Sequence, residues 1–484
     1  MSFDSLPFLG FLAAVLAAYW LLPQRFRWVL LLIVSYLFYA SWAPRFTFWI
    51  ALSTVTSYAT ARLMANTDDP KRRKRQFLVG VLISIGLLHT FKYLAFGAET
   101  FRTLVGYVGL AHWVTVPDLL LPVGISFYSL QAIGYLIDVY RGNIEPERHL
   151  GLFALYMAFF PTLVSGPIER AEHLIPQFRE TPTLDTSRLF SGLRLILWGM
   201  FKKVVIADRL GVYVNEVYAQ PGGHAGWTIV IVMFFSAAHI YADFSGYSDM
   251  AVGVARLFDL DVIQNFEQPY LASSVSDFWR RWHISFSSWL RDYVYIPLGG
   301  NRVPPWRRSL NVLIVFLVSG LWHGAAWTFV LWGLLHGVYL VLESWSKPVA
   351  DWLSRALRLE QMGLRRTLGT AVTILLVSFA WLFFYARSVP DAVLLIRNLV
   401  RLGSGTDIYA PWAGLTYAPA VEMALAWGLI GLLGLVHLAR DARLPRVSLV
   451  TGNAGVRWAG YLFLGLAILN LGVPSQLPFL YAGF

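Results

Sequence analysis

The chain has 484 residues, of which 57% are hydrophobic and only 14% are charged, whereas a soluble domain usually carries about 25% charged residues. It contains no cysteine, which excludes a thiolate nucleophile, a thiolate metal site and a disulfide framework. The net charge of +11 does not indicate nucleic-acid binding, because the basic residues form short clusters between apolar stretches, as the positive-inside rule requires of a membrane protein.

Long uncharged stretches divide the chain. A helix needs about 20 mostly apolar residues to cross the hydrocarbon core of a bilayer, and several stretches reach that length. Because a backbone amide in lipid must bond within its own segment, such stretches imply helices. The sequence therefore predicts an all-α integral membrane protein. The uncharged stretches include Trp28–Pro44, Leu119–Ile137, Val217–Ala242, Ser309–Leu342, Thr367–Ala386, Met423–Ala439 and Trp458–Phe484.

The first helices can be oriented from one basic loop. Lys71–Arg75 (KRRKR) is the clearest cytoplasmic anchor, because basic residues accumulate on the cytoplasmic side of membrane proteins. Leu6–Leu22 lacks the basic start and the small-residue cleavage site of a signal peptide, so we interpret it as a retained helix. Counting crossings through Val29–Ala43, Phe46–Ala61 and Phe77–Phe96 places the N-terminus on the periplasmic face.

The next part of the chain is apolar but interrupted. Leu119–Asp138 and Leu150–Ile168 carry prolines and glycines within apolar runs. Broken helices are tolerated in a membrane where protein or a water-filled cavity covers the freed backbone groups, so these breaks indicate a binding region. Further helices are expected near Phe190–Tyr218 and Trp227–Phe258.

A tryptophan-rich segment, residues 274–295, differs from its surroundings. Ser274 and Asp277 have the spacing of an N-terminal helix cap. Aromatic residues recur at helical spacing on one face, and arginines lie on the other. We predict one basic amphipathic helix that lies in the membrane interface or lines a cytoplasmic vestibule. The aromatic face consists of Phe278, Trp282, Phe286, Trp289 and Tyr293.

The remaining apolar stretches complete the membrane domain. Two helices are expected within residues 310–344, and the basic stretch Lys347–Arg366 then returns to the cytoplasm. Val372–Phe384, Ala420–His437 and Trp458–Gly472 add further crossings. The sequence thus predicts about 11 transmembrane helices. Re-entrant or interfacial helices complete a single membrane domain over residues 1–484.

His323 is the strongest candidate for chemistry inside the membrane. It lies in Ser319–Ala325 (SGLWHGA), deep in the longest uncharged stretch, and ionisable groups at such depth are functional candidates by default. Gly320 and Gly324 form a small-xxx-small pair that lets another helix approach closely. A neutral imidazole there can take a proton from a hydroxyl and return it. The alternative is a histidine that only hydrogen-bonds a neighbouring helix.

Other polar groups have weaker claims when they are judged by residue type alone. His283 fits a histidine at the headgroup boundary, and His336 fits a packing residue in Gly333–Gly337, a second small-xxx-small element. His239 and Asp243 share a helix face, a spacing that can start a metal site, but no third ligand is evident and we expect no metal. Asp243 alternatively orients a histidine, binds a substrate hydroxyl or caps a helix.

Several ordered strings resemble the membrane-bound O-acyltransferase family. Trp279–Ser285 (WRRWHIS) is followed by Trp289–Tyr293 (WLRDY) and Ile296–Asn301 (IPLGGN), and Ser319–Ala325 matches as well. Upstream strings resemble the bacterial branch, which includes the membrane subunit of the alginate O-acetyltransferase and the D-alanyl transfer protein of teichoic acids. These strings are Leu121–Phe127, Pro161–Pro167, Asp243–Asp249 and Asn265–Tyr270.

One difference from alginate-type relatives is visible in the sequence. Those relatives tend to end in an aromatic, often basic tail, whereas this chain ends in Leu480–Phe484 (LYAGF). The difference weakens the assignment to alginate as the polymer and leaves the resemblance to the family intact.

The resemblance implies roles for particular residues. His323 matches the family's essential membrane histidine, and His283 occupies the place of its second characteristic polar residue. The family fold is a ring of tilted helices around a thin core, where a cytoplasmic tunnel meets a pocket from the opposite face. The expected tunnel or substrate residues are Asp243, Trp279, Trp282, Trp322, Asn265 and Tyr293. The residues expected to attract CoA phosphates are Arg280, Arg281, Arg291 and Arg302.

The reaction implied by the resemblance is O-acetylation of an exopolysaccharide, alginate or another glycan. Acetyl-CoA would be the acyl-donor substrate and no cofactor would be bound, while a periplasmic partner resembling an SGNH hydrolase would pass the acetyl group on. The protein would lie in lipid, in the bacterial inner membrane. The alternatives are D-alanyl transfer from a carrier protein's phosphopantetheine, a non-catalytic scaffold of a secretion complex, and a transporter, which predicts paired charges and inverted repeats.

Overall fold

The computed structural model describes residues 1, 3–42, 44–359, 364–402, 407–413, 418–441, 454–473 and 479. Every regular element within these residues is a helix, which confirms the all-α class expected from composition. The sequence difference at Leu480–Phe484 lies outside the described residues.

The chain forms two compact units, and two helices contribute residues to both. These helices are α10 (Thr186–Met200) and α12 (Trp227–Leu257), so no linker separates the units along the sequence. The single membrane domain expected for residues 1–484 stays a prediction. Unit 1 comprises Met1–Ile196, Tyr247–Gln264 and Pro478–Phe484, and unit 2 comprises Leu197–Gly246 and Asn265–Leu477.

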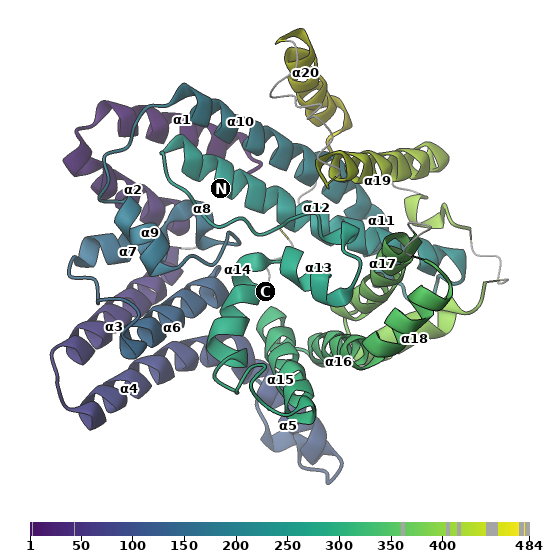
Figure 1. Cartoon of the computed structure of the whole chain (residues 1–484), viewed down its shortest axis with the longest axis horizontal. Helices are drawn as coiled ribbons and strands as arrows, with labels where there is room; N and C mark the ends of the chain where they lie inside the picture. Colours follow the sequence, from purple (N-terminus) through teal and green to yellow (C-terminus); the bar gives the residue numbers. More distant parts are fainter. Residues whose placement is uncertain are drawn as a thin grey trace. The chain divides into compact units, whose positions relative to one another are not determined.

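Unit 1 consists largely of the N-terminal helices (Figure 1). These are α1 (Leu6–Leu21), α2 (Gln24–Ala40), α3 (Thr47–Ala65), α4 (Pro70–Leu88), α5 (Leu94–Gly106), α6 (Ile125–Arg141), α7 (Leu150–Ala158), α8 (Phe160–Leu163) and α9 (Ala171–Gln177). Here α3 packs against α4 and α6, and α2 packs against α7. Local signals start the helices: Ser5 Oγ caps α1, and the Asp69 carboxylate caps α4 by accepting from the Lys71 amide at 2.9 Å.

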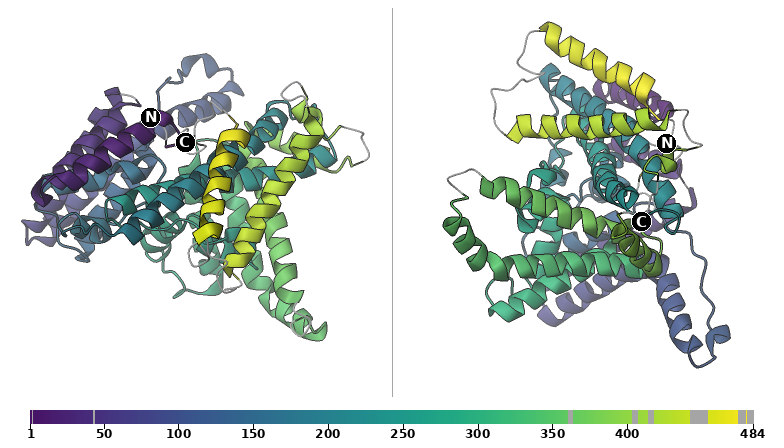
Figure 2. Two further views of the ribbon diagram at one scale, coloured as in Figure 1. Left: turned by 90° about the horizontal axis from the view of Figure 1, so that it is seen from above. Right: turned by 90° about the vertical axis from the view of Figure 1, so that its right-hand side faces the viewer.

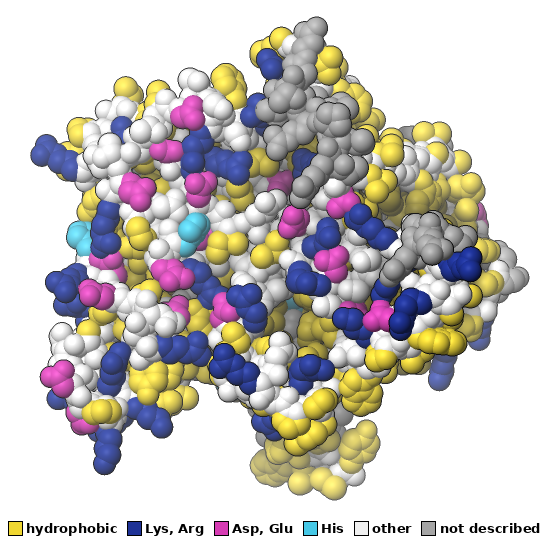
Figure 3. Space-filling model, in the orientation of Figure 1, with side chains coloured by type: hydrophobic (Ala, Val, Ile, Leu, Met, Phe, Trp, Pro, Cys, Tyr) yellow, Lys and Arg dark blue, Asp and Glu magenta, His cyan; other side chains and the backbone are white. Residues whose placement is uncertain are grey.

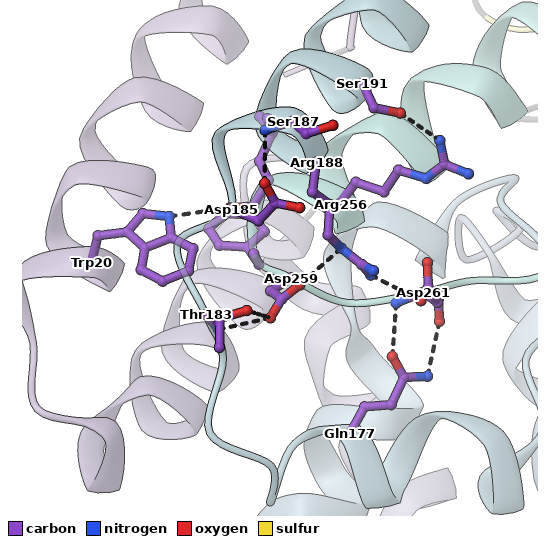
Figure 4. A network of polar contacts seen from close by, with 12 residues as sticks. Trp20, Gln177, Thr183, Asp185, Ser187, Arg188, Ser191, Arg256, Asp259 and Asp261 are labelled. Carbon is purple, nitrogen blue, oxygen red and sulfur yellow. Dashed lines mark hydrogen bonds and ion pairs between the residues drawn. The ribbon is translucent and has the colours of Figure 1, made fainter.

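A polar network in unit 1 holds the segment that follows α12 (Figure 4). Arg188 pairs with Asp259 at 2.8 Å and with Asp261 at 2.9 Å. The Gln177 side chain accepts from the Asp261 amide at 2.7 Å and donates to the Asp261 carbonyl at 3.0 Å. Asp259 also accepts from the Thr183 amide at 2.8 Å. Side chains of α9 and α10 therefore fix the path of residues 259–261.

Unit 2 contains the helices that carry the candidate residues. They are η4 (Phe201–Ala207, a π-helical turn), α11 (Asp208–Ala219), α13 (Val275–Arg281), α14 (Ile284–Leu290), η6 (Arg291–Tyr295), α15 (Pro305–His323), α16 (Trp327–Ala356), α17 (Leu364–Tyr385), α18 (Val389–Leu399), α19 (Pro419–Asp441) and α20 (Ala454–Leu471). The two helices expected within residues 310–344 are α15 and α16, which form the most extensive helix pair among the described residues.

Six helical segments among the described residues are long and apolar enough to cross a membrane. They are Pro70–Gly106, α12, α16, α17, α19 and α20. Other expected crossings coincide with shorter or less apolar helices, such as α1 and α2. The structure therefore supports a multi-pass membrane protein, while the number of crossings stays a prediction.

Large apolar side chains lie open on helices of both units, as lipid contact requires. Leu469 on α20 is 81% exposed, and Figure 2 shows α20 on the outside of unit 2. Tyr107, just after α5, is 85% exposed, and hydrophobic side chains cover the end of α5 in Figure 3. In water such surfaces would cost free energy in proportion to their area, so they fit a bilayer as the solvent.

Two glycines allow α15 and α16 to cross closely. A Cβ on Gly320 would lie 2.3 Å from the Phe329 carbonyl oxygen, and a Cβ on Gly333 would lie 2.2 Å from the Phe316 carbonyl oxygen. The Gly320 Cα lies 3.0 Å from that same Cβ position on Gly333. One glycine of each pair noted in the sequence, Gly320 or Gly333, thus faces the other across this helix pair, where backbone packing replaces side-chain packing.

We expect Gly333→Ala to destabilise the protein by about 1–3 kcal/mol, because the added methyl group overlaps backbone atoms that cannot move aside. Gly428→Ala in α19 is the matched control, since a Cβ there would meet nothing within 4 Å. Thermal unfolding of both variants in the same detergent measures the difference. Equal unfolding temperatures for the two variants would contradict the close crossing.

Candidate functional site

His323 is the last residue of α15 and lies at the turn into α16. The helix ends because the Gly324 backbone is extended, with φ −162° and ψ 148°. A Cβ on Gly324 would lie 2.1 Å from the Phe329 ring, so only glycine lets the turn close over that ring. The turn places the His323 side chain at the end of the helix pair with 1% of its surface exposed.

Aromatic rings surround the His323 imidazole and form what we call the aromatic chamber. Ring centroids of Trp332 and Trp322 lie 4.8 and 5.0 Å from that of His323, both edge-on. Phe286 and Phe384 follow at 5.5 Å each. These residues come from α14, α15, α16 and α17, so the chamber exists only in the folded unit. Its walls keep water away from the imidazole, which in its neutral form has one donor and one acceptor nitrogen.

His283 enters the same chamber from a break in the predicted amphipathic helix. Its ring centroid lies 6.4 Å from that of His323, and it packs edge-on against Phe244 at 4.7 Å. The residue has φ 45° and ψ 54°, a left-handed conformation that is uncommon outside glycine. The side chain is fully buried, while its depth relative to the lipid headgroups, which residue type alone placed at their boundary, stays a prediction.

The prediction of one continuous helix over residues 274–295 is corrected by the structure. The segment divides into α13, α14 and η6, although the expected cap at Ser274 is present and accepts from the Asp277 amide at 3.1 Å. Helical spacing of aromatic residues predicted the continuous helix. The left-handed backbone of His283 ends that periodicity and turns the second helix away from the first.

Further aromatic residues extend the chamber along α16. Trp282 lies against Trp381 at 5.2 Å, and Trp381 stacks on Trp332 at 5.5 Å. The Trp279 indole donates to His336 Nδ1 at 3.2 Å. His336, which the sequence indicated as a packing residue, therefore also holds the orientation of a predicted tunnel residue.

Asp243 belongs to a buried ion network in unit 2. Lys203 Nζ lies 2.7 Å from Asp243 and 2.8 Å from Asp208, and all three side chains are at most 4% exposed. Lys203 lies in η4, where the wider π-helical turn brings it to the same face as Asp208. His239, which shares a helix face with Asp243, instead pairs with the Tyr385 hydroxyl at 2.9 Å. Within the described part of the chain, no group of three His, Asp or Glu residues is arranged to hold a metal ion.

The other predicted substrate residues divide into buried and peripheral ones. Asn265 is buried, and its side-chain oxygen accepts from the Ser285 hydroxyl at 2.7 Å. Trp322 stacks on Phe286 at 4.1 Å within the chamber. Tyr293 is only partly buried and packs edge-on against Trp289 at 5.1 Å, outside the chamber.

The four predicted phosphate-binding arginines differ in their availability. Arg280, Arg291 and Arg302 are exposed, although Arg291 pairs with the neighbouring Asp292 at 2.8 Å. Arg281 is bound by Asp277 at 3.1 Å and lies 4.0 Å from Asp441. Figure 3 shows several Lys and Arg side chains on the face over α13, α14 and α15.

Residue-by-residue sequence analysis missed part of the site. It did not select Trp332, Trp381 or Phe384, because tryptophan and phenylalanine are common in membrane helices and carry no local signal. Lys203 was also missed, although a lysine in the expected helix Phe190–Tyr218 is itself a signal, since charges in membrane helices are rare and need a partner. Only the fold shows which carboxylates supply that partner.

The geometry suits proton transfer at a hydroxyl group. His323 can accept a proton and return it, and His283 lies close enough to contact the same reacting group. The enclosing rings remove water, which would otherwise compete as the nucleophile or screen the developing charge. Each of the two histidines is at most 1% exposed, so neither imidazole is open to solvent in this structure.

Comparisons with known proteins agree on one family. The model of MBOAT, the membrane-bound O-acyltransferase family, matches residues 148–384. A probable alginate O-acetylase, AlgI, of Pseudomonas putida is 36% identical over the full length of both chains. The peptidoglycan O-acetyltransferase of Helicobacter pylori is 34% identical over 77% of this chain and 73% of its own. The teichoic acid D-alanyltransferase of Streptococcus thermophilus is 32% identical over 46% of this chain and 57% of its own.

Proposed function

Because the chain belongs to the membrane-bound O-acyltransferase family, and is therefore an acyltransferase, we propose that it moves an acetyl group from cytoplasmic acetyl-CoA to an exopolysaccharide. The full-length similarity to probable alginate O-acetylases favours alginate or a related glycan. The protein then lies in the bacterial inner membrane with its N-terminus in the periplasm. A periplasmic partner resembling an SGNH hydrolase receives the acetyl group and passes it to the polymer.

The observation that carries this proposal is the pair of buried histidines in one aromatic chamber. His323 removes the proton from the acceptor hydroxyl while the hydroxyl oxygen attacks the thioester carbonyl carbon. The C–S bond breaks, the C–O bond forms, and the thiolate leaves with the proton that His323 returns. His283, at 6.4 Å, is placed to orient one of the two substrates. Holding both reactants in this geometry supplies much of the acceleration.

Buried hydrogen-bond donors beside the chamber support a pantetheine thioester as the donor. Trp282 Nε1, Trp332 Nε1 and His336 Nε2 are buried and have no hydrogen-bond partner among the described residues. His336 Nε2 carries the proton, because its Nδ1 already accepts from Trp279. All three rings pack around Trp381, with centroids within 6.3 Å of it.

Unsatisfied donors of this kind cost free energy, so a ligand that brings acceptor oxygens gains by binding there. The pantetheine arm carries two amide carbonyls and ends in the thioester carbonyl. Trp332 and His336 lie one turn apart on α16, and Trp332 touches His323. A pantetheine arm laid along α16 therefore brings its thioester to His323.

Exposed arginines support binding of the CoA phosphates at the entrance. Arg280, in α13, and Arg302, shortly before α15, are the best placed, because both are exposed. Arg291 in η6 is a third exposed arginine. Arg281 contributes less than we expected from the sequence, since Asp277 and Asp441 neutralise it.

The proposal is tested by acyl transfer from labelled acetyl-CoA with purified protein in nanodiscs. We expect release of CoA thiol and appearance of label on an added periplasmic partner or glycan acceptor. A parallel reaction offers D-alanine on a carrier protein's phosphopantetheine. Thiol release from the carrier alone would favour D-alanyl transfer. A scaffold role alone would remain if neither donor released thiol and if polymer acetylation were unchanged in cells that lack this protein.

A further inference from the structure

The break between α13 and α14 is braced by a short segment that precedes both helices. In a continuous helix the Ile284 amide would donate to the Arg280 carbonyl, and the Ser285 amide to the Arg281 carbonyl. Instead the Ile284 amide donates to the Asn265 carbonyl at 3.0 Å, and the Ser285 amide donates to Asn265 Oδ1 at 3.2 Å. Asn265 thus replaces two helical bonds lost at the break, one through its backbone carbonyl and one through its side chain.

One carbonyl on the other side of the break is bound by the same segment. The Arg281 carbonyl, which would accept from Ser285 in a continuous helix, accepts from the Glu267 amide at 3.0 Å. Ser285 also donates its hydroxyl to Asn265 Oδ1 at 2.7 Å. Asn265, His283 and Ser285 are all fully buried, so water cannot take over these bonds.

We propose that Asn265 is a positioning residue that holds His283 in the chamber by keeping α13 and α14 apart. A left-handed conformation costs free energy for any residue with a Cβ, so His283 does not adopt it without support. The unbroken helix is the competing arrangement, because residues 275–290 otherwise have helical character. Asn265 offers two acceptor oxygens to the Ile284 and Ser285 amides. Only the broken form can use these acceptors, so Asn265 favours the broken form.

The consequence concerns the direction of the His283 ring. Its packing against Phe244 and its 6.4 Å separation from His323 both depend on the left-handed turn. In a continuous helix the residue would follow the rotation of about 100° per residue and leave this position. Asn265 thus acts through His283 and not as a tunnel wall. The expected effect of Asn265 on the rate of acetyl transfer rests on the proposed function.

A double-mutant cycle tests whether Asn265 acts through His283. We expect Asn265→Ala to lower kcat by roughly 10- to 100-fold, the scale of a misplaced catalytic group, with the KM for acetyl-CoA changed less than about twofold. In a His283→Ala background the same substitution is expected to cause no further loss. Asn265→Asp, which keeps the acceptor oxygen, is expected to retain more activity than Asn265→Ala. Losses that multiply in the double variant would overturn the proposal.

A second measurement is independent of activity. The chain has no cysteine, so spin labels on Arg280→Cys and Arg291→Cys report the distance across the break alone. We expect one narrow distance distribution with Asn265 and a shifted or broader one after Asn265→Ala. An unchanged distribution would reject the brace even if the proposed acetyl transfer is confirmed. A changed distribution without any acetyl transfer would support the brace and reject the proposed function.

Discussion

Replacing His323 with alanine is expected to lower acetyl transfer by roughly 10²- to 10⁴-fold, the usual contribution of a general base. The His323 imidazole can accept a proton, and the four rings that surround it are those of Trp322, Trp332, Phe286 and Phe384. None of these four rings can take a proton from a hydroxyl at neutral pH. CoA thiol release under single-turnover conditions measures the loss.

The control must separate lost chemistry from lost folding. His323→Gln keeps a polar side chain of similar length, and we expect it to be as inactive as His323→Ala. His437→Gln is the matched control: His437 is also a buried membrane histidine, 3.0 Å from the Tyr241 hydroxyl, and is not part of the chamber. We expect His437→Gln to stay within about threefold of wild type, since glutamine can still bond that hydroxyl. Activity of a folded His323→Ala protein near the wild-type level would remove His323 from the mechanism.

Lys203→Met is expected to destabilise unit 2 by about 3–5 kcal/mol, the scale of breaking a buried ion pair by removing one partner. Without the ammonium group, the Asp208 and Asp243 carboxylates stay buried beside each other and must be protonated or displaced. In the wild-type protein Lys203 lies 2.7 Å from Asp243 and 2.8 Å from Asp208, so its positive charge offsets the repulsion between the two carboxylates. Thermal or denaturant unfolding in detergent measures the change.

Two further variants make this prediction specific. Lys202→Met removes the adjacent buried lysine, whose ammonium donates to the neutral Ser245 hydroxyl at 2.9 Å, and is expected to cost less. The triple variant Lys203→Met/Asp208→Leu/Asp243→Leu replaces all three charges with apolar groups and is expected to recover most of the lost stability. If Lys203→Met alone unfolds at the wild-type temperature, the three side chains do not form the network described.

The ion network gives Asp243 a structural partner, while its expected role as a substrate or tunnel residue stays a prediction. An aspartate in a membrane helix is a functional candidate by default, and its sequence neighbours resembled a family motif. The structure assigns its carboxylate to Lys203, which lies on a different helix and far away in sequence. A pairing of this kind cannot be inferred from either segment alone, because neither segment shows which residues of the other lie beside it in the fold.

His283 illustrates the opposite case. Residue type favoured a histidine at the membrane surface, and only the resemblance to the family placed it in the site. In the structure a left-handed residue between α13 and α14 brings the ring to 6.4 Å from that of His323, and the catalytic role of His283 stays a prediction. Periodicity could not predict this break, since the bonds that stabilise it come from Asn265 and Glu267, upstream of the helix itself.

The sequence by itself determined the class of protein and singled out His323 as a candidate. Both follow from local rules: uncharged stretches of membrane-spanning length must be helical, and an ionisable group inside one is seldom there by chance. The glycine pairs around His323 and His336 likewise predicted a close helix crossing. Only the tertiary structure decided which rings enclose His323, which carboxylates neutralise Lys203 and which way His283 points. Those features depend on contacts between helices that are distant in sequence, where packing and hydrogen bonding override the preference of each segment alone.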